Sequence, residues 1–297
     1  MKTINTLIQD IYATVEKDGW FTNDLSRDFS EELGRRLVES TAARNQSPTL
    51  RLSKMGPICE KQLWHSIHTP ELEERLQPWA RIKFTYGHIL EVLVIAMAKS
   101  SGHTVTGEQD AVDVDGIKGH RDCVIDGCIV DVKSTTSLSF NKFKDKTIAQ
   151  NDSFGYLDQL DGYLVGSSAD PLVTCKDRAY ILAIDKQLGH MCLYEHHLRE
   201  QHIRERVANY KKLVALATPP SCTCGTVAEG KSGNIKLDTR ASYSGFKNVC
   251  HPQLRTFLYA RGPVYLTHVA KEPKDVTEIT KAGYVKTNFS GSEEDSC

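Results

Sequence analysis

Apolar side chains return every three or four residues in several stretches of the chain, and this spacing predicts amphipathic helices. The longest stretch covers residues 78–99, with apolar positions from Ile89 to Met97 and Ser100-Ser101-Gly102 at its end. Ser30-Glu31-Glu32 resembles the start of another helix. The same spacing predicts helices over residues 4–17, 30–43, 138–150, 154–165 and 198–217.

Short runs of apolar and β-branched residues predict strands over residues 103–107, 111–114, 117–125, 128–133, 179–185 and 191–195. Asp126-Gly127 is a strong signal for a two-residue hairpin turn between the third and fourth of these strands. The order of helices and strands predicts an α/β fold in which helices flank a mixed central sheet.

The polar segment at residues 44–48 predicts a hinge, because it combines turn-forming residues with Pro48. We therefore expect an N-terminal helical segment over residues 1–45 and a main domain over residues 46–270. Residues 271–297 are polar, and we expect them to form a frayed C-terminal tail.

The composition is that of an ordinary soluble globular protein: 40% of the 297 residues are hydrophobic and 25% are charged. No apolar run reaches the roughly 18–20 residues that span a bilayer, so no membrane partner is expected. The start of the chain lacks a signal-peptide pattern, which predicts a cytoplasmic location, in the host cytoplasm if the protein is phage-encoded. The net charge of -1 argues against a large nucleic-acid footprint but permits a locally basic cleft.

The chain has nine cysteines, an odd number that fits thiols or metal ligands better than disulfides in a protein without a signal peptide. Four of them fall in predicted strands or turns and are expected to be small core residues: Cys123, Cys128, Cys175 and Cys192.

The predicted hairpin carries the most promising chemistry. Asp122 and Asp131 lie on its two neighbouring strands, and period-two alternation puts Asp131 and Lys133 on one face. Two nearby carboxylates repel unless a cation lies between them, and Mg²⁺ is commonly held by such a pair. A solvent-facing hairpin with the same residues is the plain alternative. Apolar neighbours such as Val130 and Val132 instead indicate a buried strand, where charged residues must be paired or used.

Gly119-His120-x-Asp122 followed by Asp131-x-Lys133 resembles the core of the PD-(D/E)XK nucleases, in particular their RecB-like exonuclease branch. Three further motifs are similar to that branch in the expected order over residues 50–270: Ser53 to Trp64, Gly87 to Glu91 and Gln159 to Tyr163. The first is similar to the N-terminal cysteine motif of the CRISPR-associated and AddB-type members. The later part of the chain most resembles phage-encoded members. The resemblance implies a restriction-endonuclease-like core.

The resemblance also implies a site for Mg²⁺ or Mn²⁺ with four ligands: Glu91, Asp122, Asp131 and the carbonyl of Val132. Many members have a histidine where this chain has Glu91, and His88 lies one helical turn earlier. Glu91 is preferred because it occupies the last position of the motif.

Lys133 would be the catalytic lysine, acting together with Asp122 and Asp131, and Gln159 and Tyr163 would line the path of the DNA. Gln159 and Tyr163 are four residues apart and therefore share a helix face. No role is assigned to His120.

Relatives with the N-terminal cysteine motif hold an iron–sulfur cluster with one early and three late thiolates. Cys59 and Cys250 fit the first and last positions, but Ala241 and Ser244 stand at the other two, so the set is incomplete and the cluster is expected to be absent. Alternatively, Cys222 and Cys224 complete a four-thiolate site for iron–sulfur or zinc. Engineered removal of cysteines is a third interpretation.

Two further groups have open interpretations. Trp64, Trp79 and Tyr86 would either stack on unpaired bases or pack in the core. The basic residues between His196 and Arg206 alternate with glutamates, which favours a surface helix with internal salt bridges.

The sequence therefore predicts a metal-dependent DNA nuclease, an exonuclease acting on single strands or DNA ends in phage recombination, replication or DNA degradation. Its partners would be DNA and replication or recombination proteins. The alternatives are a non-catalytic DNA-binding or assembly protein on the same fold, an RNA nuclease, and a partner in CRISPR spacer acquisition.

Overall fold

A computed structural model of the chain describes residues 2–42, 48–279 and 285–286. The chain divides into two compact units. The first unit comprises residues 1–57 and 76–211, and the second comprises residues 58–75 and 212–297. The predicted hinge at residues 44–48 falls almost wholly outside the described residues, as does the acidic end of the tail. The predicted division at residues 45 and 270 stays a prediction.

The first unit is built on a five-stranded sheet with the order β1-β4-β5-β6-β7. Its strands are β1 (Val105–Thr106), β4 (Cys123–Ile125), β5 (Cys128–Thr135), β6 (Arg178–Asp185) and β7 (Met191–His197). β5 and β6 are parallel, while the other neighbours are antiparallel. The predicted α/β fold with a mixed central sheet flanked by helices is therefore confirmed, and it is consistent with a restriction-endonuclease-like core.

The hairpin between β4 and β5 turns at Asp126-Gly127, as predicted. Both residues have positive φ, 50° and 81°, as a two-residue type I′ turn requires. The turn fixes the register, in which Cys123 faces Val130 and Ile125 faces Cys128. One step further along, Asp122 comes opposite Asp131.

The prediction of one continuous strand over residues 117–125 is wrong. The segment forms two strands, β3 (Ile117–His120) and β4, and β3 pairs with β2 (Ala111–Val114) in a separate ribbon. The break falls at Arg121, whose fully buried guanidinium forms ion pairs with Asp110 at 2.8 Å and Asp170 at 2.6 Å. A side chain held in this way directs the backbone away from a continuous strand.

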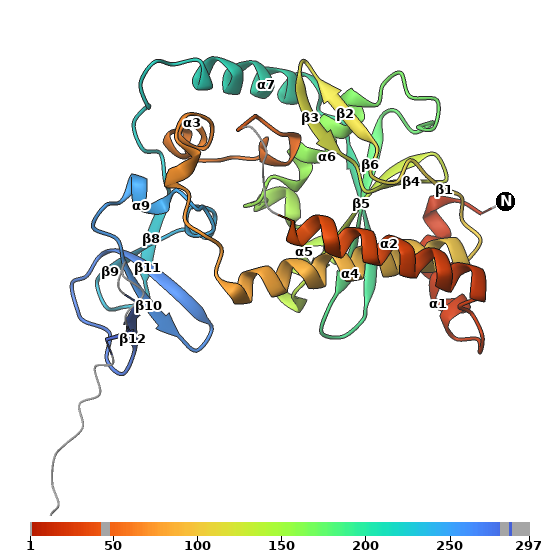
Figure 1. Ribbon diagram of the computed structural model, residues 1–297, viewed down its shortest axis with the longest axis horizontal. Helices are drawn as coiled ribbons and strands as arrows, with labels where there is room; N and C mark the ends of the chain where they lie inside the picture. Colours follow the sequence, from red (N-terminus) through yellow and green to blue (C-terminus); the bar gives the residue numbers. More distant parts are fainter. Residues whose placement is uncertain (1, 43–47, 280–284, 287–297) are drawn as a thin grey trace, which may run out of the picture. The chain divides into compact units, whose positions relative to one another are not determined.

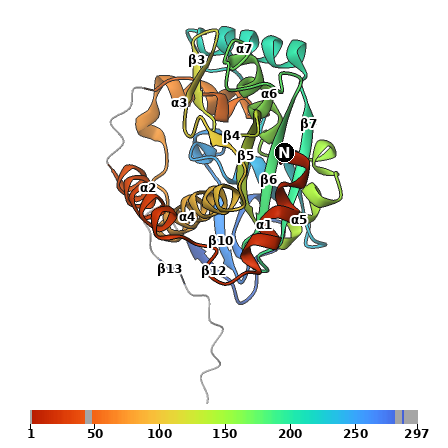
Figure 2. The same ribbon diagram turned by 90° about the vertical axis from the view of Figure 1, so that its right-hand side faces the viewer.

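Helices cover both faces of the sheet, because alternate residues of β5 point to opposite sides. Val130 and Val132 pack with α1 (Leu7–Val15) and α4 (Pro78–Ser100), whereas Ile129 belongs to the core on the other face. That second core is formed with α5 (Ser137–Lys144), α6 (Tyr156–Gly166) and α7 (Glu200–Val214). Figures 1 and 2 show β5 between these two helical layers.

Helix α2 (Asn23–Thr41) lies along α4 in both views (Figures 1 and 2). It begins at Asn23 and not at Ser30, because Thr22 caps it by accepting a hydrogen bond from the Leu25 N–H at 3.3 Å. None of its residues is fully buried. Short 3-10 turns lie at Ile4–Thr6, Leu52–Lys54, Pro70–Leu72 and Ile148–Gln150. Within the described ranges, no helix combines the length and apolarity needed to cross a bilayer.

The second unit contains a six-stranded antiparallel sheet that the sequence did not predict, with the order β13-β12-β10-β11-β9-β8. Its strands are β8 (Thr226–Glu229), β9 (Asn234–Leu237), β10 (Arg255–Tyr259), β11 (Gly262–His268), β12 (Thr277–Ile279) and β13 (Val285–Lys286). Three short helices belong to this unit: α3 (Glu60–His68), α8 (Thr239–Ser242) and α9 (Lys247–Cys250).

Two cysteines expected to be free core thiols form a disulfide, Cys128–Cys175. The pairing follows from local backbone geometry: the N–H groups of Thr174 and Cys175 both donate to the Gly127 carbonyl, at 2.8 and 3.0 Å. These bonds bring residue 175 beside the start of β5. Cys123 is a free, buried thiol, as expected.

Candidate functional site

The hairpin positions the first predicted carboxylate against the backbone of β5. Asp122 immediately precedes β4, and its Oδ2 accepts a hydrogen bond from the Val132 N–H at 2.8 Å. In an antiparallel pair the N–H and C=O of one residue point to the same side. The Val132 carbonyl therefore points to the same side of β5 as the Asp122 carboxylate.

Asp131 and Lys133 share a face of β5, as the alternation predicted, and Lys133 Nζ lies 2.5 Å from Asp131 Oδ2. Asp131 is 1% exposed, and neither of its carboxylate oxygens has a well-directed hydrogen bond from the residues that the structure describes. Burial raises the pKa of Asp131 to about 7. Burial opposes the charge on Lys133, but the neighbouring carboxylates Asp131 and Asp122 outweigh it and raise the lysine pKa above its usual value.

Glu91 lies on α4 and has two partners from other elements. Its Oε1 forms an ion pair with the Arg36 guanidinium on α2 and accepts a hydrogen bond from Gln109 Nε2 at 2.9 Å. Burial and the charge of Asp122 raise the pKa of Glu91 to about 8. His88, one turn earlier on α4, has a lowered pKa because it is partly buried and lies near Arg36.

Arg36 and Gln109 are the residues of this site that the sequence analysis missed. Arg36 is 55 positions from Glu91 and lies on a polar helix, so no local pattern marks it. Both the Arg36 and the Glu91 side chains are only about one-eighth exposed, at 12% and 13%.

The three predicted carboxylate ligands lie in one charged environment, but each has its own protein partner. Asp122 binds a backbone N–H, Asp131 binds Lys133, and Glu91 binds Arg36. Within the described part of the chain, these carboxylates do not form a group whose ligand atoms all approach within 4.8 Å. They fit a divalent cation in their oxygen chemistry and in the buried Asp131 Oδ1, which has no partner among the described residues. A cation would have to replace Arg36 at Glu91.

Gln159 and Tyr163 share a face of α6, and Gln159 Nε2 donates to Tyr163 Oη at 2.5 Å. Gln159 is partly exposed, whereas Tyr163 is 2% exposed and lies in the core. Burial and the charge of Asp131 raise the Tyr163 pKa. The Gly119 of the sequence motif has a packing role here, because a Cβ on it would lie 2.8 Å from Leu52 and 3.1 Å from Tyr163.

His120 is exposed at the end of β3. The basic residues of the 196–206 region are mostly engaged with two buried acids of α6. Asp161 accepts from His196 at 2.7 Å and from Arg199 at 2.8 Å, while Asp158 accepts from His202 at 2.8 Å. The expected salt bridges are present, but they join helices α6 and α7 with strand β7 and are not confined to one surface helix.

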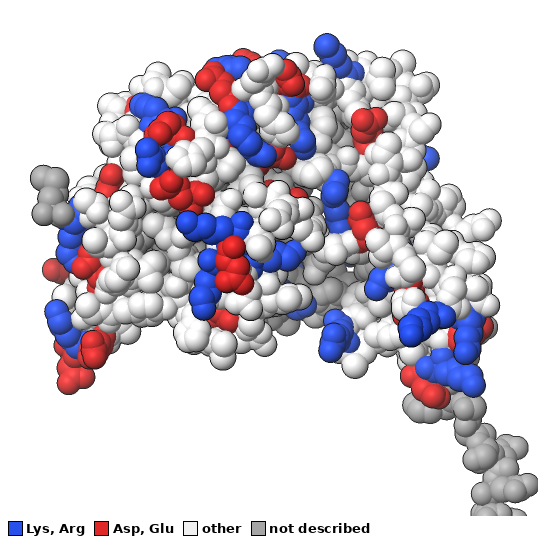
Figure 3. Space-filling view, turned by 180° about the vertical axis from the view of Figure 1, so that it is seen from behind, with Lys and Arg blue, Asp and Glu red and all other residues white. Residues whose placement is uncertain are grey.

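The surface charges are mixed in sign. On the face in Figure 3, lysines and arginines lie among aspartates and glutamates over short distances. This mixture matches the net charge of -1. A nucleic acid would therefore be held by local features and not by a broad basic surface.

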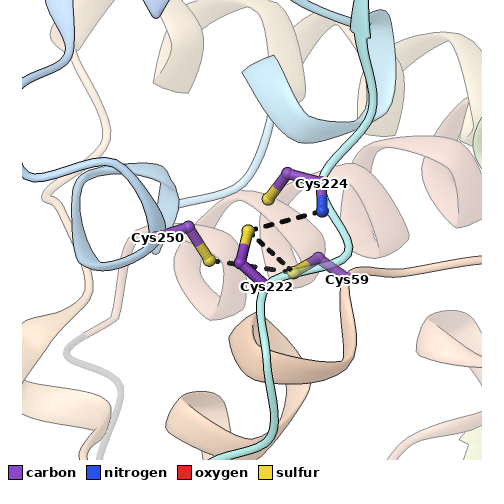
Figure 4. Close-up of side chains that lie close together, drawn as sticks. All are labelled: Cys59, Cys222, Cys224 and Cys250. Atoms are coloured by element: carbon purple, nitrogen blue, oxygen red, sulfur yellow. Dashed lines mark hydrogen bonds between the residues drawn. The ribbon is translucent and has the colours of Figure 1, made fainter.

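A second candidate site lies in the second unit, where four thiols meet. Cys59 precedes α3, Cys222 and Cys224 precede β8, and Cys250 ends α9 (Figure 4). Cys59 Sγ lies 3.9 Å from Cys222 Sγ and 3.7 Å from Cys250 Sγ, and all four sulfurs are within 4.8 Å of one another. Hydrogen bonds from Cys224 and Cys250 lower the Cys59 pKa far below its usual value.

Neither residue at the two usual cluster positions offers a thiolate. Ala241 packs with Leu237 and Leu254 in a small apolar core, and Cys224 packs against the same core. Ser244 Oγ accepts a hydrogen bond from the Phe246 N–H at 3.1 Å. The structure thus brings together the alternative set that includes Cys222 and Cys224.

Of the three aromatic residues with two interpretations, one packs inside the second unit. Trp64 is 8% exposed, stacks on His68 at 4.1 Å between centroids and donates to the Leu216 carbonyl at 2.9 Å. Trp79 and Tyr86, on α4, are 45% and 55% exposed.

Comparison with known proteins does not assign the chain to a family. No family model matches it, and no curated protein matches it. The crystal structure of SSO0001 superposes with a TM-score of 0.39 at 15% identity, over 75% of this chain and 93% of that one. An alkaline exonuclease (LHK-Exo) from Laribacter hongkongensis superposes with a TM-score of 0.32 at 10% identity, over 55% of this chain and 88% of that one.

Proposed function

We propose that this chain is a metal-dependent deoxyribonuclease that hydrolyses phosphodiester bonds at the β4–β5 hairpin. The observation that carries the proposal is the buried Asp131 carboxylate, which is paired with Lys133 and lies between the apolar residues Val130 and Val132. Burying a charged side chain in a central strand costs stability, and such groups are concentrated at functional sites.

Glu91, Asp122, Asp131 and the Val132 carbonyl would hold the cation, which we propose to be Mg²⁺ or Mn²⁺ because all four ligands are oxygens. A bound divalent cation supplies Lewis acidity toward a phosphoryl oxygen and lowers the pKa of a bound water. The residues of the chain would then orient the DNA at this cation.

Lys133 would act as a fixed positive charge. The carboxylates around it raise its pKa, so it stays protonated at neutral pH and is poorly suited to remove a proton from water. An ammonium group in this position stabilises the negative charge that grows on the phosphate in the transition state. Asp131 holds the ammonium group on the same face of β5.

The proposed substrate is DNA in single strands or at ends, and the proposed setting is phage recombination, replication or DNA degradation inside the host cell. Gln159 is partly exposed on α6 and is available to contact the strand. Tyr163 would act by positioning Gln159 through its hydroxyl group, because its ring is buried.

The four thiols would form a second metal site with a structural role. Zinc bound at about 2.3 Å in tetrahedral geometry holds its sulfurs roughly 3.8 Å apart, and the two measured separations are 3.7 and 3.9 Å. An iron–sulfur cluster places several metal ions between the thiolates and spreads them further apart. We therefore favour one zinc ion, which metal analysis and absorbance near 400 nm would distinguish from a cluster.

The nuclease activity is tested on end-labelled linear and closed circular DNA with Mg²⁺, Mn²⁺ or a chelator, and on RNA of the same sequence. We expect linear DNA to be degraded only with a divalent cation, and Asp131→Asn to abolish that degradation. Cleavage in the chelator, or full activity of Asp131→Asn, would contradict the proposal. Preference for RNA would reassign the substrate.

A further inference from the structure

The first half of helix α4 is exposed although it is rich in large apolar side chains. Trp79, Ile82, Phe84 and Tyr86 are 45%, 53%, 56% and 55% exposed. The second half of the same helix is buried in the sheet-facing core from Val92 to Ala98. Exposed apolar residues gathered in this way mark a surface that binds something.

The charge of this segment favours a polyanion as its partner. No acidic residue occurs between Glu74 and Glu91, whereas Arg81 and Lys83 lie among the exposed aromatics. Lys83 Nζ lies 4.8 Å from the centre of the Trp79 ring. Aromatic faces combined with fixed positive charges suit single-stranded nucleic acid, whose bases stack while its phosphates pair with cations. An apolar partner without negative charge would gain nothing from these positive charges.

Helix geometry connects this surface to the candidate active site. Phe84 and Glu91 are seven residues apart, so they point within about 20° of each other and lie roughly 10 Å apart along the axis. His88 lies between them on nearly the same face, and Arg81 lies about one turn beyond Phe84. The face of α4 that carries Glu91 therefore continues to the exposed Phe84 and Arg81, whereas Trp79, Ile82, Lys83 and Tyr86 lie on the opposite side of the helix.

We propose that Arg81 and Phe84, here called the α4 platform, bind unpaired nucleotides next to the bond that is cleaved. Phe84 stacks on a base, and Arg81 contacts a phosphate. The proposal rests on the proposed function for the identity of the site at Glu91. It adds that strand preference is determined by α4, because paired bases do not expose their faces to a side chain.

Binding is measured by the fluorescence anisotropy of a labelled oligothymidylate of roughly 20 nucleotides, in a chelator so that no cleavage occurs. We expect Phe84→Ala to weaken binding roughly 5- to 150-fold, as for loss of one stacked base. Phe84→Trp should bind at least as tightly as the wild type, and Phe84→Leu should be weak like the alanine variant. Leu188→Ala, which truncates an apolar side chain that is 63% exposed in the β6–β7 turn, is the matched control and should bind normally.

A second measurement tests the phosphate contacts. Arg81→Gln should lower the slope of log affinity against log salt concentration by about 0.7, as for one phosphate contact on a single strand. Equal binding by the wild type, Phe84→Ala and Arg81→Gln would overturn the proposal and point to a protein partner for this surface. Weak binding by Phe84→Leu shows stacking, while normal binding by that variant shows plain apolar contact and refutes it.

The outcomes separate the platform from the nuclease. If Asp131→Asn leaves cleavage unchanged but Phe84→Ala weakens binding, the proposed function fails and the platform stands. If Asp131→Asn abolishes cleavage but Phe84→Ala binds normally, the nuclease stands and the platform fails.

Discussion

The proposed metal site predicts that Arg36 competes with the cation for Glu91 and that its removal strengthens metal binding. In the metal-free protein its guanidinium is the counter-ion of Glu91, and both side chains are nearly buried. Removing one partner of a buried pair typically costs about 3–5 kcal/mol. We expect about 3 kcal/mol, the lower end, because Gln109 still donates to Glu91 and the carboxyl group can take up a proton.

A bound cation restores the missing positive charge, so this cost disappears in the loaded protein. The same free energy therefore reappears as tighter binding, and Arg36→Ala should bind Mn²⁺ roughly 150-fold more tightly than the wild type. Its unfolding temperature should be lower without metal and should rise more when Mn²⁺ is added. Mn²⁺ is the suitable probe because it prefers oxygen ligands to the thiol cluster.

The assay is calorimetric titration with Mn²⁺ at pH 8.5, above the Glu91 pKa of about 8, together with thermal unfolding. Arg35→Ala is the matched control, since Arg35 is 47% exposed and pairs only with acids of its own helix, Glu32 and Glu39. Its loss should change stability by less than about 1 kcal/mol and leave metal affinity unchanged. Equal or weaker Mn²⁺ binding by Arg36→Ala would refute the competition.

Three further predictions concern pH, packing and the thiols. Because the pKa values of Asp131 and Glu91 are raised to about 7 and about 8, the affinity for Mn²⁺ should rise with pH up to about 8, and calorimetry should show that binding releases protons. An Mn²⁺ affinity that does not change with pH would contradict this prediction. Without metal, the same shifts make the free energy of unfolding fall over that range, because the folded state holds the extra protons. Gly119→Ala should lower the free energy of unfolding, measured in urea, by about 1–3 kcal/mol, because the added Cβ meets packed side chains. The control Gly34→Ala, on the exposed helix α2, should leave this free energy unchanged or raise it. A larger loss in Gly34→Ala than in Gly119→Ala would exclude the packing role of Gly119. Cys250→Ser should release the thiol-bound metal and lower the unfolding temperature, and unchanged metal content would show that the thiols do not hold it.

The hairpin and the placement of its charged residues were predictable from local sequence. Asp126-Gly127 specified a turn that few other dipeptides adopt, and the turn alone fixes which residues face each other. Alternation then put Asp131 and Lys133 on one face, where the ion pair lies. The long helix over residues 78–99 was equally predictable, because its apolar spacing persists over many turns.

Features formed between distant segments were not predictable. Arg36 meets Glu91 only because α2 packs along α4, and nothing in a polar helix indicates which of its basic residues will be covered. The strands of the second sheet are short, and β8 is almost wholly exposed, so they lack the apolar alternation that marks a strand. The thiol cluster combines residues separated by 163 and 191 positions, so the sequence offered this set only as one of several alternatives and could not select it.

The most direct test of the nuclease site is the rate of nucleotide release from linear DNA at saturating Mg²⁺ by the wild type, Lys133→Ala and Lys118→Ala. Lys118 is an exposed lysine on β3 and controls for the loss of one positive charge. We predict a rate reduced by about 100- to 1,000-fold in Lys133→Ala, as for loss of one charge-stabilising group, and no change in Lys118→Ala. Equal rates for all three proteins would contradict the assignment of the hairpin as the active site.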